Sequence, residues 1–131
     1  MNDLLTGSSL IGSADVRPDG GTFRAVNPAT GAELDPGYGE AGPAEVERAA
    51  ALAAAAFPAY RRTTAEQRAA FLESIAANIE ALGSTLAERV NAETGLPAGR
   101  VAGETARTVG QLRLFASVLR GGVWRRVRVD T

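Results

Sequence analysis

The stretch Thr22–Leu34 reads TFRAVNPATGAEL, and it has the residues of two short strands joined by a compact turn. Asn27 precedes a proline, which pushes its backbone into an extended conformation. Pro28 fixes φ for a turn, and Gly31 tolerates a positive φ. The sequence therefore predicts a β-hairpin over this stretch.

From Pro43 onward the sequence changes from rich in turn residues to helical. Pro43 suits the first position of a helix, where its missing N–H leaves no hydrogen bond unmade. Apolar side chains then recur with helical spacing, at Val46, Ala49, Ala50, Ala53 and Phe57. Pro58 is predicted to end or kink this helix, because it removes a donor and clashes with the preceding turn.

Two further helices are predicted on either side of Gly83. Thr64 and Gln67 have the spacing of a capping box ahead of the first one. Its apolar face carries Phe71, Leu72, Ile75, Ile79 and Leu82. Gly83 is predicted to be a left-handed stop, and Ser84 to cap a shorter helix that ends at Gly95.

The last and longest helix is predicted to begin at Pro97 and to run to about Arg120, closed by Gly121-Gly122. Its apolar stripe is Val101, Thr105, Val109, Leu112, Ala116 and Leu119. After it, residues 123–129 alternate apolar and charged side chains, the pattern of a half-buried strand.

The motif at Asn27–Gly31 (Asn-Pro-x-Thr-Gly), with Glu93–Pro97 (ETGLP) and Gly110–Ala116 (GQLRLFA), resembles the N-terminal segment of the aldehyde dehydrogenase superfamily. The order and spacing agree over essentially all 131 residues. The sequences of Gly21–Thr30, Phe71–Ile75 and Glu93–Pro97 most resemble the branch that oxidises 2-oxoglutarate semialdehyde (2,5-dioxopentanoate).

The resemblance implies an α/β fold: the N-terminal hairpin strands and four-helix portion of a Rossmann-like NAD(P)-binding domain, truncated before the parallel sheet. Residues 1–131 would be part of that domain, with short strands over 1–40, helices over 43–121 and a terminal strand over 123–129. In the family, these elements cover one face of the sheet. The implied partners are the remainder of the dehydrogenase chain and, in the parent, further subunits of a homo-oligomer.

The family's chemistry uses a cysteine nucleophile and a glutamate base. This chain has no cysteine and no histidine, so ordinary zinc sites are excluded as well. Gly20-Gly21 and Gly121-Gly122 lack the spacing of a phosphate-binding glycine loop. We therefore expect no catalytic, cofactor-binding or metal-binding residues here, and we expect NAD or NADP to bind only the full-length parent.

Glu104 has two interpretations. By resemblance it lies near a position where some family members bind a monovalent cation, with the backbone at Val26 as a second ligand. The alternative is an ordinary surface carboxylate on a helix. Trp124 is similarly either an interface anchor or a side chain that covers the core.

Other charged groups favour structural roles. The run of Arg125, Arg126 and Arg128 indicates a strand edge guarded by charge, with phosphate binding as the alternative. The paired carboxylates are interpreted as solvated charges rather than as acid–base pairs: Glu45 with Glu47, and Glu80 with Glu88.

The formal net charge is −1, with acids and bases interspersed, which argues against a nucleic-acid-binding surface. No apolar run approaches the roughly 20 residues that span a bilayer, and we expect a cytoplasmic protein without membrane contacts. Two hypotheses remain: the N-terminal fragment of an aldehyde dehydrogenase, expected to be inactive alone, or a complete non-catalytic helical interaction module. Coding DNA beyond Thr131 would discriminate them.

Overall fold

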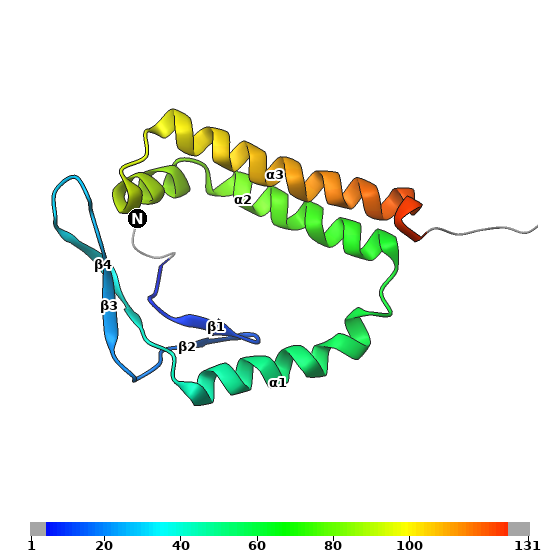
Figure 1. Cartoon of the computed structure of the whole chain (residues 1–131), viewed down its shortest axis with the longest axis horizontal. Helices are drawn as coiled ribbons and strands as arrows, with labels where there is room; N and C mark the ends of the chain where they lie inside the picture. Colours follow the sequence, from blue (N-terminus) through cyan, green and yellow to red (C-terminus); the bar gives the residue numbers. More distant parts are fainter. Residues whose placement is uncertain (1–4, 126–131) are drawn as a thin grey trace, which may run out of the picture. The chain divides into compact units, whose positions relative to one another are not determined.

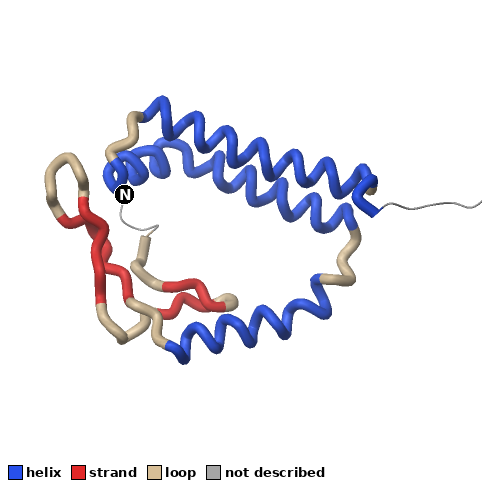
Figure 2. The backbone as a smooth tube through the Cα atoms, in the orientation of Figure 1, coloured by secondary structure: helices blue, strands red, loops and turns tan. Residues whose placement is uncertain are grey.

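The computed structural model describes residues 5–125 (Figures 1 and 2). In this range the elements, in chain order, are β1 (Ser9–Ile11), β2 (Ala14–Val16), β3 (Thr22–Val26), β4 (Glu33–Gly39), α1 (Pro43–Tyr60), α2 (Ala65–Thr94), α3 (Ala98–Gly121) and the 3-10 turn η1 (Val123–Arg125).

The described residues form two compact units. The first ends at Arg61 and includes Ala92–Gly95, so it holds both pairs of strands and α1. The second takes Arg62–Asn91 and the described residues from Leu96, and it is built from α2 and α3. Figure 2 colours the helices blue and the strands red.

The predicted hairpin is confirmed by β3 and β4, which pair antiparallel from Thr22 opposite Gly39 to Val26 opposite Glu33. At the turn the Asn27 N–H donates to the Ala32 carbonyl at 2.9 Å, and Gly31 has φ 73° as predicted.

A second hairpin, β1–β2, lies ahead of the predicted one, so the region of short strands contains four strands. Strands β1 and β2 have three residues each, too few to show an alternating pattern. Gly7, ahead of β1, has φ 74°, and a Cβ there would stand 2.1 Å from the Gly37 carbonyl oxygen. The Gly39 N–H donates to the Gly7 carbonyl at 3.1 Å, so only glycine allows this approach of the chain to β4.

Helix α1 begins at Pro43, as predicted, and Glu45 accepts the Gly42 N–H at 2.9 Å. The helix continues to Tyr60, so Pro58 lies within its last turn rather than at its end. The missing N–H of Pro58 removes one hydrogen bond to the preceding turn, and the helix ends two residues later. No side chain of α1 is buried, and Phe57 on its predicted apolar stripe is 59% exposed.

The capping box before α2 is confirmed, with the Gln67 N–H donating to Thr64 Oγ1 at 3.1 Å and the Thr64 N–H to Gln67 Oε1 at 2.8 Å. Gly83 breaks α2 with φ 49° and ψ −127°, visible as a change of direction in Figure 1. The predicted positive φ at Gly83 is confirmed, but its ψ is not that of a left-handed helical residue.

The contact between α2 and α3 is made by small side chains: Ala69, Ala76, Val101, Val109 and Ala116 are at most 3% exposed. The predicted stripe of α3 is thereby confirmed at its three buried members. On α2 the predicted stripe of large apolar side chains is not the buried one, since Phe71 is 54% exposed and Leu82 is 38% exposed. Alanines on the neighbouring line allow the two helix backbones to approach, and the larger residues are left beside the contact.

The predicted terminal strand is wrong over Val123–Arg125, which form η1. The Arg125 N–H donates to the Gly122 carbonyl at 3.0 Å. An alternating pattern gives a strand only where a partner strand accepts its hydrogen bonds, and this turn satisfies them locally. Gly122 itself, with φ 66°, ends α3 as predicted. The rest of the predicted strand, 126–129, lies outside the described residues.

Candidate functional site

One edge of the α2–α3 pair is an ion-paired edge, formed by Glu66, Glu73 and Glu80 of α2 with Arg113 and Arg120 of α3. Arg120 donates to Glu66 at 2.8 Å and to Glu73 at 2.5 Å. Arg113 donates to Glu80 at 2.6 and 2.9 Å through both terminal nitrogens. Because Arg120 pairs near the start of α2 and Arg113 further along it, the two helices run antiparallel.

Hydrogen bonds dominate the electrostatics of this edge. Those from Arg120 hold the pKa of Glu66 and of Glu73 below the ordinary value of 4.5. The same bonds raise the pKa of Arg120, that to Glu73 most, and Glu80 raises the pKa of Arg113. All these groups are solvent-accessible, so each pair stabilises the fold modestly, and the shared Arg120 makes them a network.

The sequence analysis missed this edge, although its signal is present. Glu66, Glu73 and Glu80 recur every seven residues, and so do Arg113 and Arg120. Seven residues are nearly two helical turns, so each set lies in one line along its helix. Opposite charges at matched seven-residue steps on consecutive helices indicate an antiparallel charged seam.

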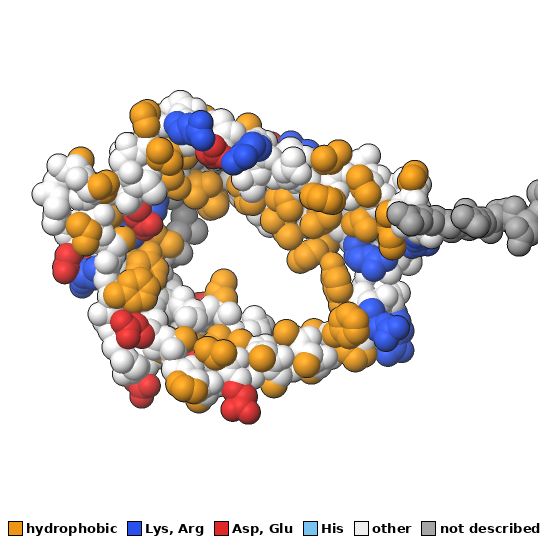
Figure 3. Space-filling view, in the orientation of Figure 1, with side chains coloured by type: hydrophobic (Ala, Val, Ile, Leu, Met, Phe, Trp, Pro, Cys, Tyr) orange, Lys and Arg blue, Asp and Glu red, His pale blue; other side chains and the backbone are white. Residues whose placement is uncertain are grey.

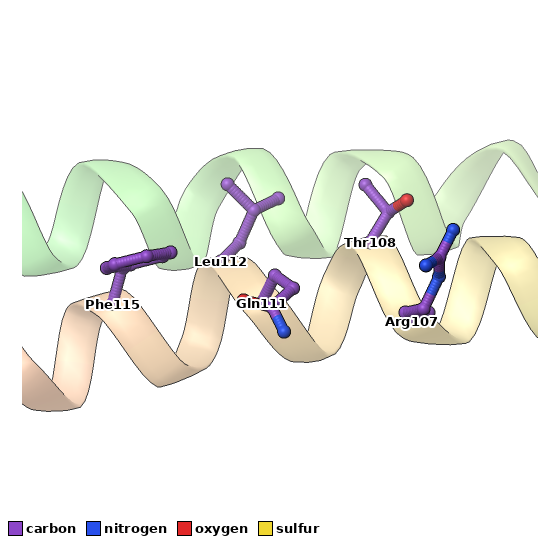
Figure 4. Close-up of a pocket in the computed structure, with 5 residues that line it drawn as sticks. All are labelled: Arg107, Thr108, Gln111, Leu112 and Phe115. Atoms are coloured by element: carbon purple, nitrogen blue, oxygen red, sulfur yellow. The ribbon is translucent and has the colours of Figure 1, made fainter.

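The other edge is an apolar edge with two adjoining hollows. The first, of about 350 Å³, is lined by Ile79, Leu82, Leu86, Val90, Leu96, Val101, Glu104, Thr105 and Thr108. The second, of about 490 Å³, is lined by Arg107, Thr108, Gln111, Leu112 and Phe115 (Figure 4). Thr108 lines both hollows, so they are neighbours along α3.

This edge has the properties of an association surface. Figure 3 shows hydrophobic side chains gathered along the helix pair. Leu82 and Leu96 are each 38% exposed and Phe115 is 56% exposed. Contiguous exposed apolar side chains with polar groups at their border are typical of surfaces that bind another protein segment. Among residues 5–125, no cluster of carboxylate, histidine or cysteine side chains could hold a metal ion.

Glu104 lies at the border of the first hollow. It accepts from Arg100 at 2.7 Å and from Arg107 at 2.5 Å, and the Arg107 hydrogen bond lowers the pKa of the Glu104 carboxyl. A cation at this carboxylate would compete with two guanidinium groups. The cation hypothesis for Glu104 and the backbone at Val26 stays a prediction, without support from this electrostatic setting.

The remaining candidate residues either have structural partners or are exposed to solvent. Glu80 is bound to Arg113 and Glu45 caps α1, so both have structural partners rather than only solvent. Trp124 is 49% exposed with the Arg125 guanidinium 5.2 Å from its ring centre, which favours the interface interpretation over coverage of a core. Arg126 and Arg128 lie outside the described residues.

The helix starts do not fit the pyrophosphate of a nicotinamide cofactor. Such a site needs free backbone N–H groups at a helix N-terminus. Two starts carry a proline, at Pro43 and at Pro97, and the N–H groups of Thr64 and Gln67 are occupied by the capping box. That the chain itself holds no cofactor site stays a prediction. No helix among residues 5–125 has the length and apolar character to cross a bilayer.

Comparison with known proteins gives consistent matches. Residues 16–129 match the sequence profile of the aldehyde dehydrogenase family. The chain is 53% identical over 127 residues to alpha-ketoglutaric semialdehyde dehydrogenase 2 of Azospirillum brasilense, covering 96% of this chain and 24% of that protein. It is 54% identical over 87 residues to alpha-ketoglutaric semialdehyde dehydrogenase of Acinetobacter baylyi, covering 66% of this chain and 16% of that protein.

A more distant match is N-succinylglutamate 5-semialdehyde dehydrogenase of Pseudomonas fluorescens, 36% identical over 115 residues, with 87% of this chain and 22% of that protein covered. The chain thus spans less than a quarter of the length of each of these relatives.

Proposed function

The chain belongs to the aldehyde dehydrogenase family, and from this membership we propose that it forms the N-terminal part of a dehydrogenase that oxidises 2-oxoglutarate semialdehyde to the carboxylate with NAD or NADP. The observation that carries the proposal is the 53% identity to the Azospirillum protein over 96% of this chain. The names of that protein and of the Acinetobacter relative specify the same semialdehyde.

The part of this chain in that enzyme is structural. The 131 residues contain no cysteine, so the family's nucleophile comes from elsewhere in the longer protein. The proposed role of α2 and α3 is to cover one face of the Rossmann-like sheet that completes the cofactor domain. An apolar edge with Phe115 56% exposed supports this role, because it gives such a sheet a surface to pack on. We further propose a homo-oligomeric, cytoplasmic parent.

A chimera tests this proposal. The matching N-terminal quarter of the Azospirillum relative is replaced by this chain, and oxidation of 2-oxoglutarate semialdehyde is followed by the formation of reduced nicotinamide. We expect activity within about tenfold of the unmodified relative, because the two segments are 53% identical. A folded but inactive chimera would contradict the proposal.

The chain alone should behave differently. Purified protein with NAD or NADP and the semialdehyde should give no reduced nicotinamide above the blank, and calorimetric titration should show no nucleotide binding. Enzyme-dependent turnover, or micromolar binding, by the purified chain would contradict the structural role proposed for it.

A further inference from the structure

Arg68, near the start of α2, has an unsatisfied polar atom. Its Nε is buried and has no hydrogen-bond acceptor. The arginines of the ion-paired edge are bound to glutamates, and Arg100 and Arg107 are bound to Glu104. Buried donors normally have partners, so an unsatisfied one needs an explanation.

The spacing along α2 places Arg68 in line with the apolar edge. Arg68, Ile75 and Leu82 follow one another at seven-residue steps, nearly two turns each, so they share one side of the helix. Leu82 lines the first hollow. The glutamates of the ion-paired edge form a separate line, so the helical spacing places Arg68 on the same side of α2 as Leu82, near the start of the helix.

A segment that packs on the apolar edge has to compensate the positive charge of the Arg68 guanidinium. A guanidinium keeps its proton in proteins. Removing it from water without a counter-charge is strongly unfavourable, whereas a hydrogen-bonded carboxylate compensates it. The first turn of a helix also attracts negative charge, because its free N–H groups carry partial positive charge. The surface therefore favours an apolar occupant that brings one carboxylate to Arg68.

We propose that this occupant is a segment of the remaining polypeptide of the longer dehydrogenase, packed along the apolar edge with a carboxylate hydrogen-bonded to Arg68. The proposal rests on the proposed function. The chain spans 24% of its Azospirillum relative, so most of such a protein is available to supply the cover. Within residues 5–125, the unsatisfied Nε of Arg68 defines the chemistry that the covering segment must have.

The test uses Arg68→Met in the chimera and in the isolated chain, with Arg48→Met, on the exposed surface of α1, as the matched control. In the chimera, Arg68→Met should shorten the half-life of heat inactivation by about tenfold or more, because it leaves a buried carboxylate unpaired. In the isolated chain, the unfolding midpoint should not fall, since Arg68 has no hydrogen bond to lose. Arg48→Met should change neither quantity.

Two more variants test the chemistry of the partner. If it is a carboxylate, Arg68→Lys in the chimera should retain more of the half-life than Arg68→Gln, because only lysine keeps the charge. Equal half-lives for Lys and Gln would indicate backbone carbonyls and overturn the carboxylate assignment.

The remaining outcomes are also decisive. An active chimera that is unaffected by Arg68→Met would overturn this inference and leave the proposed function standing. An inactive chimera with the native arginine would contradict both. Loss of self-association by the isolated Arg68→Met chain, with no change in the chimera, would assign the edge to a second copy and overturn the inference.

Discussion

The two edges of the α2–α3 pair are built from the same helices. They differ in how far the charged and apolar side chains find partners within the pair itself. On the ion-paired edge, Arg120 alone engages Glu66 and Glu73. On the apolar edge, Phe115 and Leu82 stay exposed and the Nε of Arg68 has no acceptor. One edge thus fastens the helices together, and the other is suited to a further segment of protein.

The small-residue contact between α2 and α3, which lies between the two edges, can be disrupted by a larger buried side chain. Ala76→Leu should destabilise the helix pair by about 1–3 kcal/mol, because Ala76 is 0% exposed and a larger side chain forces the helices apart. Ala77→Leu, on the exposed side of the same turn, is the matched control and should have little effect. Urea unfolding followed by circular dichroism measures both. Equal stability of the two variants would show that the small-residue contact is not the core of the pair.

The apolar edge can be tested by its association. The isolated chain should show helical circular dichroism, a weakly cooperative melt, dye binding and concentration-dependent self-association. Replacing Leu82 and Phe115 together by serine should raise the dissociation constant by about tenfold or more and reduce dye fluorescence. Leu10→Ser, at a residue 81% exposed on β1, is the control. A monodisperse native chain with a sharp melt and no dye binding would favour a self-contained module.

Disrupting the ion-paired edge has the smallest expected effect on stability, and the pH dependence of that effect identifies it. The pKa values of Glu66 and Glu73 are lower in the folded chain than the ordinary 4.5, so pairing with Arg120 stabilises the fold fully above that pH. This stabilisation is lost as the pH falls below 4.5 through the folded-state pKa. Arg120→Met should therefore lower the thermal midpoint modestly at pH 7 and by less at pH 3. A midpoint difference that is the same at both pH values would contradict a role for these carboxylates.

Signals carried by a few adjacent residues predicted the fold well. Pro43, the box at Thr64–Gln67 and the glycines at 83 and 122 mark boundaries or breaks because each acts on backbone groups within a few residues of itself. Features that depend on a distant partner were not predictable in this way. The alternating residues 123–125 form no strand, because a strand needs a partner strand. The buried side chains of α2 are alanines rather than the larger apolar residues, because helix packing decides which side of α2 is buried.

The candidate surface was predicted only in part. The apolar stripes of α2 and α3 were identified from the sequence, and the family resemblance implied that they cover one face of a sheet. The sequence had no local signal for Arg68, whose significance comes from the burial of one nitrogen atom. The seven-residue spacing of the charges was visible in the sequence and was missed.

The break at Gly83 determines where the first hollow can exist. Leu86 and Val90, which line it, follow the break, whereas Ile79 and Leu82 precede it. If α2 ran straight, the segment after residue 83 would continue along the axis of the first half of the helix, with a rise of about 1.5 Å per residue. Leu86 and Val90 would then swing away with it and the wall of the hollow would be lost. One residue without a side chain thus sets the shape of a surface made by its neighbours, and any attempt to strengthen this helix by filling that position would reshape the surface as well.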